Sequence, residues 1–134
     1  MGFEIIEHTA DVGVRCWDAT IEGCFEQAAL GVLAINGAYI SGPGERDTIE
    51  LGAPDLGALL VDWISEVLYL HDARDAVVTG LAVTSIDNNK LSGWIELRPR
   101  TEEIEGTSVK AVTYHRLSVE RADKGWTATF YVDV

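Results

Sequence analysis

The 134-residue chain has only two cysteines, three prolines and ten basic residues, and its apolar runs are short. Cys16 and Cys24 have no Cys or His pair near them. This excludes the usual zinc-ligand and redox spacings and indicates small apolar side chains packed in a core. The longest apolar stretch, 56–70, is interrupted by charged and polar residues, so no membrane-spanning segment is expected. The opening MGFEIIEH lacks a basic region and a long apolar core, which predicts no signal peptide and a reduced, cytoplasmic protein.

Positive charge is also scarce. Ten Lys and Arg residues stand against 22 Asp and Glu, which gives a formal net charge of -12. Each phosphate contact of a nucleic acid needs a local cation, so stable direct binding of nucleic acid is not expected. A metal ion or a basic protein surface is a more natural counterpart. The hydrophobic fraction of 47% is typical of a folded globular protein, and residues 1–134 are predicted to form a single domain.

Two segments have the periodicity of amphipathic helices. Apolar residues recur at steps of three and four from about residue 21 to 36, and again from Leu56 to about His71. Asp18 and Thr20 offer N-cap oxygens for the first helix, and the residue pair 36–37, Asn-Gly, is a good C-terminal stop. The second helix has an apolar surface that covers more than half of its circumference, which indicates a central position.

Seven further segments are predicted as strands from their alternating or β-rich patterns. They are 3–7, 12–17, 47–51, 77–86, 91–97, 109–120 and 126–132. The order β-β-α-β-α-β-β-β-β predicts an α+β fold with two helices packed on one face of a mostly antiparallel sheet.

Carboxylates occur both at the turn after the first strand and at the end of the chain. The stretch from His8 to Asp11 is more polar than a simple hairpin turn requires. The last residues have a strand pattern, so the Asp133 side chain and the α-carboxylate of Val134 are expected on an ordered scaffold. Carboxylates brought together repel one another, and Ca²⁺ or Mg²⁺ commonly relieves that repulsion. The alternative is an edge strand with solvated terminal charges, which the spacing alone favours.

The segment 109–116 is a third polar feature. Strand alternation predicts that Lys110, Tyr114 and Arg116 project to one face and His115 to the other, more apolar face. The first three side chains would form a small cationic face on a very acidic protein. An ordinary solvated strand face is the alternative, and His115 is expected to be half-buried and hydrogen-bonded.

Glu66 on the second helix is expected to be partly buried and to need a polar partner, for which Lys110 is a candidate. His8, Asp11, Glu66 and His115 can also be imagined as the site of a metal-dependent hydrolase, but nothing in their spacing requires it. The chain has no Gly-rich phosphate loop, nucleophile elbow or zinc signature.

Four blocks of this sequence resemble the archease family: EHTADVGV at 7–14, LLVDWISEVLY at 59–69, VKAVTYH at 109–115 and VDV at 132–134. They occur in the family's order and span nearly the whole chain. The resemblance implies a non-enzymatic accessory protein whose partner is the RtcB-type tRNA-splicing ligase. Such a protein promotes guanylylation of the ligase's active-site histidine, permits multiple turnover and broadens the nucleotide that the ligase accepts. The family fold, a strand-helix-strand-strand module with an insertion, is compatible with the predicted α+β fold.

The resemblance also implies a metal site. Carried over by motif, its ligands are Asp11, Asp133 and Val134 through its carboxylate. A divalent cation is the implied cofactor, with Ca²⁺ favoured and Mg²⁺ or Mn²⁺ as alternatives, because all-oxygen ligands suit these hard cations. Lys110 also matters functionally in the family. Further candidates for a role in ligase activation are His8, Glu66 and His115.

The chain departs from the family pattern at two positions. Asp18 and Gly23 stand where many archeases have a glycine and a helix-favouring residue, which is expected to loosen the first helical turn by about 1 kcal/mol. Two other functions compete with ligase activation. A general RNA or protein chaperone predicts RNA binding without the ligase, and a metal-dependent hydrolase predicts phosphoester turnover by the protein alone.

Overall fold

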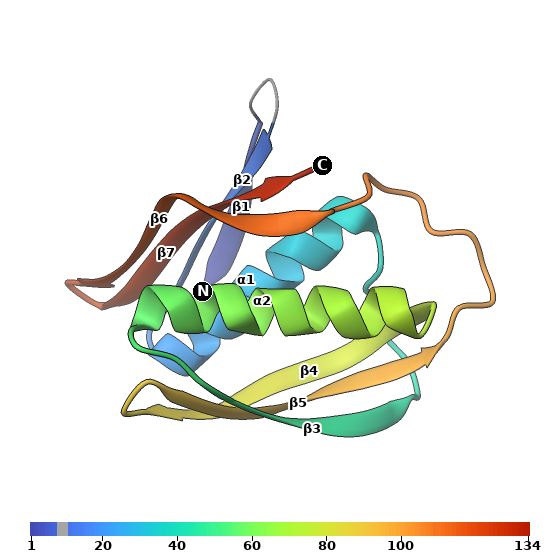
Figure 1. Cartoon of the computed structure of the whole chain (residues 1–134), viewed down its shortest axis with the longest axis horizontal. Coiled ribbons are helices and arrows are strands. Elements are labelled where there is room, and N and C mark those ends of the chain that lie inside the picture. Colours follow the sequence, from blue (N-terminus) through green and yellow to red (C-terminus); the bar gives the residue numbers. More distant parts are fainter. Residues whose placement is uncertain (8–10) are drawn as a thin grey trace.

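The computed structural model describes residues 1–7 and 11–134. Two helices lie between two antiparallel sheets, so the elements form three layers (Figure 1). In chain order the elements are β1 (Gly2–Glu7), β2 (Asp11–Asp18), α1 (Ile21–Asn36), β3 (Glu45–Gly52), α2 (Leu56–Ala73), β4 (Ala76–Asp87), β5 (Lys90–Pro99), β6 (Ala111–Ala122) and β7 (Gly125–Asp133). The predicted order of elements and the α+β class are confirmed.

The strands divide into two sheets, with the orders β1-β2-β7-β6 and β3-β5-β4, where the sequence predicted a single sheet. Both helices contact both sheets. This explains the broad apolar surface of α2, because a helix between two layers buries side chains in two directions. Alternation along a strand shows which residues face a core, but it does not show which strands pair.

Side-chain hydrogen bonds begin both helices. Thr20 accepts a hydrogen bond from the Gly23 N–H at 3.0 Å, and Asp55 accepts one from the Ala58 N–H at 2.8 Å. Each oxygen satisfies a backbone donor that has no partner within the helix. At the other end of α1, Gly37 adopts a left-handed conformation with a φ of 72°, which ends the helix as the sequence predicts.

The core joins the two helices through Trp63, which is fully buried and donates its indole N–H to the Phe25 carbonyl at 2.9 Å. Cys16 and Cys24 are fully buried free thiols with their sulfur atoms 3.9 Å apart, so the prediction of core cysteines is confirmed. The hydrogen bond with Cys24, together with burial, raises the pKa of the Cys16 thiol. In the described part of the chain, neither α1 nor α2 has the length and apolar character needed to cross a bilayer.

Candidate functional site

Asp11 and Asp133 lie directly opposite each other in the antiparallel pairing of β2 with β7. Opposite residues on antiparallel strands point to the same face, with Cβ atoms about 4.5–5.5 Å apart. The neighbouring pair, Val12 and Val132, packs on the core. The two aspartates therefore belong to the outer face of this sheet, where Asp133 is exposed and Asp11 is half-buried. The structure thus brings together two of the three predicted metal ligands.

The third predicted ligand, the α-carboxylate of Val134, follows Asp133 directly. Asp133 is held from both sides, because β7 lies between β2 and β6. The Lys110 N–H donates to the Asp133 carbonyl at 2.8 Å, and Ala111 pairs with Asp133 in the register of β6 with β7. The end of β7 is therefore held between two neighbouring strands, and Val134 follows it directly (Figure 1). We call Asp11, Asp133 and the terminal carboxylate the acidic tip.

An aromatic side chain lies next to the acidic tip on the same outer face. Tyr131 is opposite Gly13, and a β-carbon on that glycine would come within 2.7 Å of the tyrosine ring. The absence of a side chain at Gly13 therefore lets the ring lie against the β2 backbone. The ring of His115 meets Tyr131 edge-on, with 6.0 Å between ring centroids. His115 is exposed, so the prediction of a half-buried histidine is wrong.

The segment 109–116 does not form the regular strand on which the expected cationic face depended. The pairing of β6 with β7 shifts register between Thr113 and Ser118, and Arg116 within this bulge has a φ of 53°. The regular alternation ends at Thr113, because extra residues in one strand change which side chains face each way. The strand pattern in the sequence contains no signal for this bulge.

Glu66 is half-buried on α2, as predicted, but it forms no ion pair with Lys110 among the described residues. The α2 residues that face Lys110 across a groove include Ser65 and Tyr69. Positions 65 and 69 lie on one helical face, and position 66 is turned about 100° from position 65 and about 60° from position 69. The prediction of a Glu66–Lys110 contact is wrong for this geometric reason.

The acidic tip supplies only part of a cation site through its side chains. In the described residues, no group of three or more His, Cys, Asp or Glu side chains could hold a metal ion. Asp11 and Asp133 provide two carboxylates, and the α-carboxylate of Val134 follows Asp133 directly in the chain. His8 lies outside the described residues. The donor chemistry fits a hard cation, for which carboxylate oxygens are the preferred ligands.

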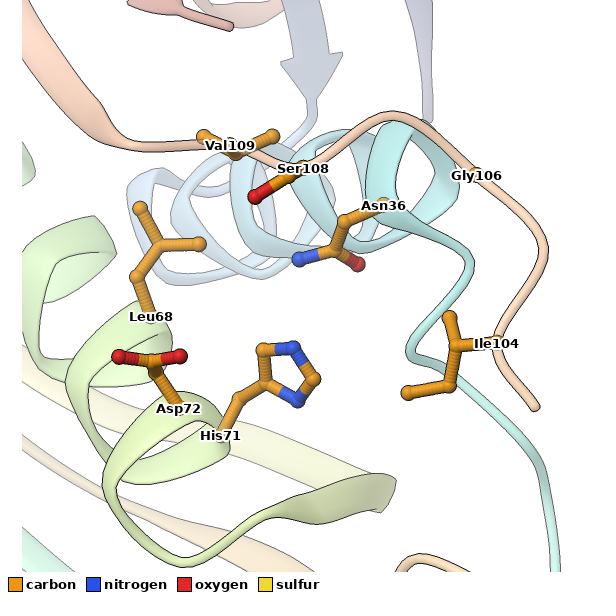
Figure 2. Close-up of a pocket in the computed structure, with 8 residues that line it drawn as sticks. All are labelled: Asn36, Leu68, His71, Asp72, Ile104, Gly106, Ser108 and Val109. Carbon is orange, nitrogen blue, oxygen red and sulfur yellow. The ribbon is translucent and has the colours of Figure 1, made fainter. Parts of the chain in front are cut away.

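A small cavity lies between the ends of both helices and the segment that precedes β6. It has a volume of about 200 Å³ (Figure 2). Its lining residues are Asn36, Leu68, His71, Asp72, Ile104, Gly106, Ser108 and Val109. The sequence does not predict this site, because the cavity lining comes from three distant segments. The adjacent polar pair His71-Asp72 at the end of an apolar helix is the one local signal for it.

The model of the Archease protein family matches residues 3–134. The chain belongs to the archease family. Similar proteins include the archease of Methanosarcina mazei, which is 36% identical over 141 residues and matches 98% of this chain and 95% of its own length. The archease of Saccharolobus islandicus is 38% identical over 139 residues, with 98% of each chain covered.

Two solved structures of the archease family have similar folds. The solution structure of protein 1598 from Methanobacterium thermoautotrophicum has a TM-score of 0.79 at 25% identity and covers 99% of both chains. A crystal structure from Thermotoga maritima, described as that of an "archease, possible chaperone", has a TM-score of 0.68 at 22% identity. It covers 98% of this chain and 96% of the Thermotoga chain. The second similarity concerns the fold alone.

Proposed function

We propose that this archease activates an RtcB-type tRNA-splicing ligase without catalysing a reaction itself, and that the acidic tip is the activating group. The choice of partner is what the archease resemblance implies, and the family model matches residues 3–134. The observation that supports the site is the register of β2 with β7, which sets the Asp11 and Asp133 carboxylates opposite each other beside the chain terminus.

The acidic tip is suited to a divalent cation. Like charges directly opposite each other destabilise an antiparallel pair, and a cation between them would reverse the sign of this interaction. Ca²⁺ is the favoured ion because it accepts irregular arrangements of oxygen ligands and mixed carboxylate and water coordination; Mg²⁺ and Mn²⁺ are the alternatives. When bound, the cation supplies positive charge that can face phosphate oxygens in the ligase's nucleotide pocket.

Charge complementarity would direct the association. The chain carries a net charge of -12, whereas a pocket that binds triphosphate and RNA must be cationic. Opposite charges of this kind speed association and make it sensitive to salt. We therefore expect the complex with the ligase to weaken as ionic strength rises.

The proposal is tested by single-turnover guanylylation of a purified RtcB-type ligase in the presence of this protein. Asp11→Asn, Asp133→Asn and Lys110→Ala are each expected to reduce activation about 10-fold or more. A C-terminal extension should do the same, because it converts the terminal carboxylate into an amide. Asp123→Asn is the matched control, since Asp123 is an exposed carboxylate in the turn at the opposite end of β7. Wild-type activation by all four altered proteins would refute the site.

The same preparation separates the competing functions. A chaperone would suppress aggregation of an unrelated unfolding protein, or bind RNA, without any ligase. A hydrolase would turn over a phosphoester alone. Either result, combined with no effect on ligase guanylylation, would replace the proposed function.

A further inference from the structure

We infer that the cavity shown in Figure 2 binds an extended peptide segment of a partner protein by holding one of its peptide groups between Asn36 and His71. This inference goes beyond the proposed function, because none of the cavity residues belongs to the acidic tip. It assigns a second binding site, lined in part by the segment that leads into β6.

One side of the cavity supplies hydrogen-bond donors. Asn36 is only 7% exposed, and the Oδ1 atom of its side-chain amide accepts a hydrogen bond from the Ala38 N–H at 3.0 Å. That contact settles the orientation of the amide, since an N–H donor must meet the oxygen. The Asn36 amide nitrogen has no partner among the described residues and points into the cavity (Figure 2). The Ser108 hydroxyl lies on the same side.

The facing side supplies acceptors. The Nδ1 atom of His71 lies 2.5 Å from the Ala76 carbonyl oxygen, which can only accept, so Nδ1 carries the hydrogen. In the neutral ring, Nε2 is then an acceptor. Figure 2 shows Nε2 directed toward the Asn36 amide. The exposed Asp72 carboxylate adjoins His71 and forms no ion pair within the described part of the chain.

The wall formed by the segment before β6 is fixed in place. Gly106 packs directly on the end of α1. A β-carbon at this position would come within 2.5 Å of the backbone carbonyl carbon of Asn36. The Thr107 N–H donates to the Ile35 carbonyl at 2.9 Å. Arg100 binds Asp75 at 2.8 Å, which ties the start of the segment to the turn after α2. The two polar sides of the cavity are therefore held apart by the fold itself.

A trans peptide group matches this arrangement. Its carbonyl and its N–H point in opposite directions, so the carbonyl can accept from Asn36 while the N–H donates to His71. The faces of the group would lie against the apolar side chains of Leu68, Ile104 and Val109. A nucleobase presents donors and acceptors along shared edges, and its phosphates would meet a chain of net charge -12. The observations therefore favour a peptide.

The cavity adjoins a second hollow along α2. This hollow, of about 480 Å³, shares four lining residues with the first and runs along α2 to Tyr69 and Lys110. Asp72 lines both hollows, whereas Lys110 lines only the second. A basic residue beside the peptide group bound in the first cavity would therefore meet the exposed Asp72 carboxylate. We therefore expect a partner segment that is extended and basic.

The inference is tested by titrating the ¹⁵N-labelled protein with an acetylated and amidated AAKAA pentapeptide in the millimolar range. The Asn36 side-chain amide and the backbone amides of Asp72 and Ser108 should shift. Asn36→Asp keeps the oxygen that accepts from Ala38 but removes the donor. His71→Asn keeps a donor for Ala76 but removes the acceptor at the Nε2 position, because the shorter side chain places no atom there. Each should weaken binding about 3- to 10-fold, the range for loss of one hydrogen bond.

Three matched measurements complete the test. The same peptide with N-methyl groups at its internal peptide bonds should bind the wild-type protein no more tightly than the unmodified peptide binds either variant. The Asp133→Asn protein should bind the unmodified peptide as tightly as the wild type does. Absence of binding, equal binding by the N-methylated peptide, or shifts confined to the acidic tip would each overturn the inference. Shifts of the cavity residues by guanosine or uridine but not by the peptide would also overturn it. The peptide titration does not measure ligase activation. Its result can therefore support or overturn the peptide site whether or not the proposed function holds.

Discussion

The carboxylate of Asp18 occupies the space that a side chain at position 23 would need. A β-carbon on Gly23 would come within 1.9 Å of the Asp18 Oδ2 atom. The same oxygen accepts hydrogen bonds from the backbone N–H and the hydroxyl of Thr20, both at 3.1 Å. Thr20 in turn accepts from the Gly23 N–H at 3.0 Å. The two positions that depart from the family pattern are therefore complementary parts of one capping arrangement.

Replacing Gly23 should reverse the usual effect of this substitution. Gly→Ala inside a helix normally stabilises by up to about 1 kcal/mol. Here we expect Gly23→Ala to lower the free energy of unfolding by about 1 kcal/mol. The Asp18 carboxylate would have to move, and its hydrogen bonds with the Thr20 N–H and hydroxyl would break. In an Asp18→Gly background the same change should stabilise. Urea unfolding of the four proteins measures the coupling, and additive effects would show that the carboxylate simply rotates away.

Two glutamates of α1 cover the free edge of β4. The Val83 N–H donates to Glu26 at 2.9 Å and the Ile86 N–H donates to Glu22 at 3.0 Å. We expect Glu26→Ala to cost about 1–3 kcal/mol and to speed hydrogen exchange at Val83, because a strand N–H loses a charged acceptor. Glu26→Gln retains an oxygen and should cost less. Asp62→Ala, at an exposed helix position, is the control; equal losses at positions 26 and 62 would contradict the edge role.

The raised pKa of the Cys16 thiol should make stability fall at high pH. The unfolded thiol ionises near its ordinary pKa of about 8.5, whereas the folded thiol keeps its proton. The folded state then binds more protons, so the free energy of unfolding decreases above about pH 8.5, by up to about 1.4 kcal/mol per pH unit. This contribution is fully present at lower pH. Cys16→Ala should show a shallower decline between pH 8 and 10, and an unchanged slope would disprove the assignment.

The acidic tip should respond to cations in the absence of any partner. If Asp11 and Asp133 hold Ca²⁺, the ion should stabilise the fold by about 2.7 kcal/mol at a concentration about 100 times its Kd. Asp133→Asn should lose this response. In the presence of chelator its free energy of unfolding should be about 0.2–1 kcal/mol higher than that of the wild type, because the repulsion across the strand pair is relieved. Thermal unfolding with Ca²⁺, Mg²⁺ or chelator measures both effects. An identical Ca²⁺ response in Asp133→Asn would locate the ion elsewhere.

Local sequence signals predicted most elements well. Both helices begin near residues with capping oxygens, Thr20 and Asp55, and their apolar stripes match the buried faces. Strand bounds differ from the prediction by a few residues at most, as expected where an end is set by pairing rather than by pattern. The single-sheet arrangement and the regular strand alternation through 109–116 were wrong, because pairing partners and bulges depend on contacts between distant segments.

The site was predicted in part and by different means. A strand pattern that runs to the last residue indicated an ordered terminus, while the link between Asp11 and Asp133 came from the family resemblance. The cavity between Asn36 and His71 was not predicted, because its lining comes from three segments that are distant in the sequence.

By itself, the sequence determined the helices, their caps, the buried cysteines and the acidic charge, because each depends on residues within a few positions or on simple composition. Tertiary structure alone decided that Asp11 lies opposite Asp133 and that Asn36 faces His71. The physical reason is that strand register and helix packing are chosen by the burial of the whole core, and a shift of one residue would turn every side chain of a strand to the other face.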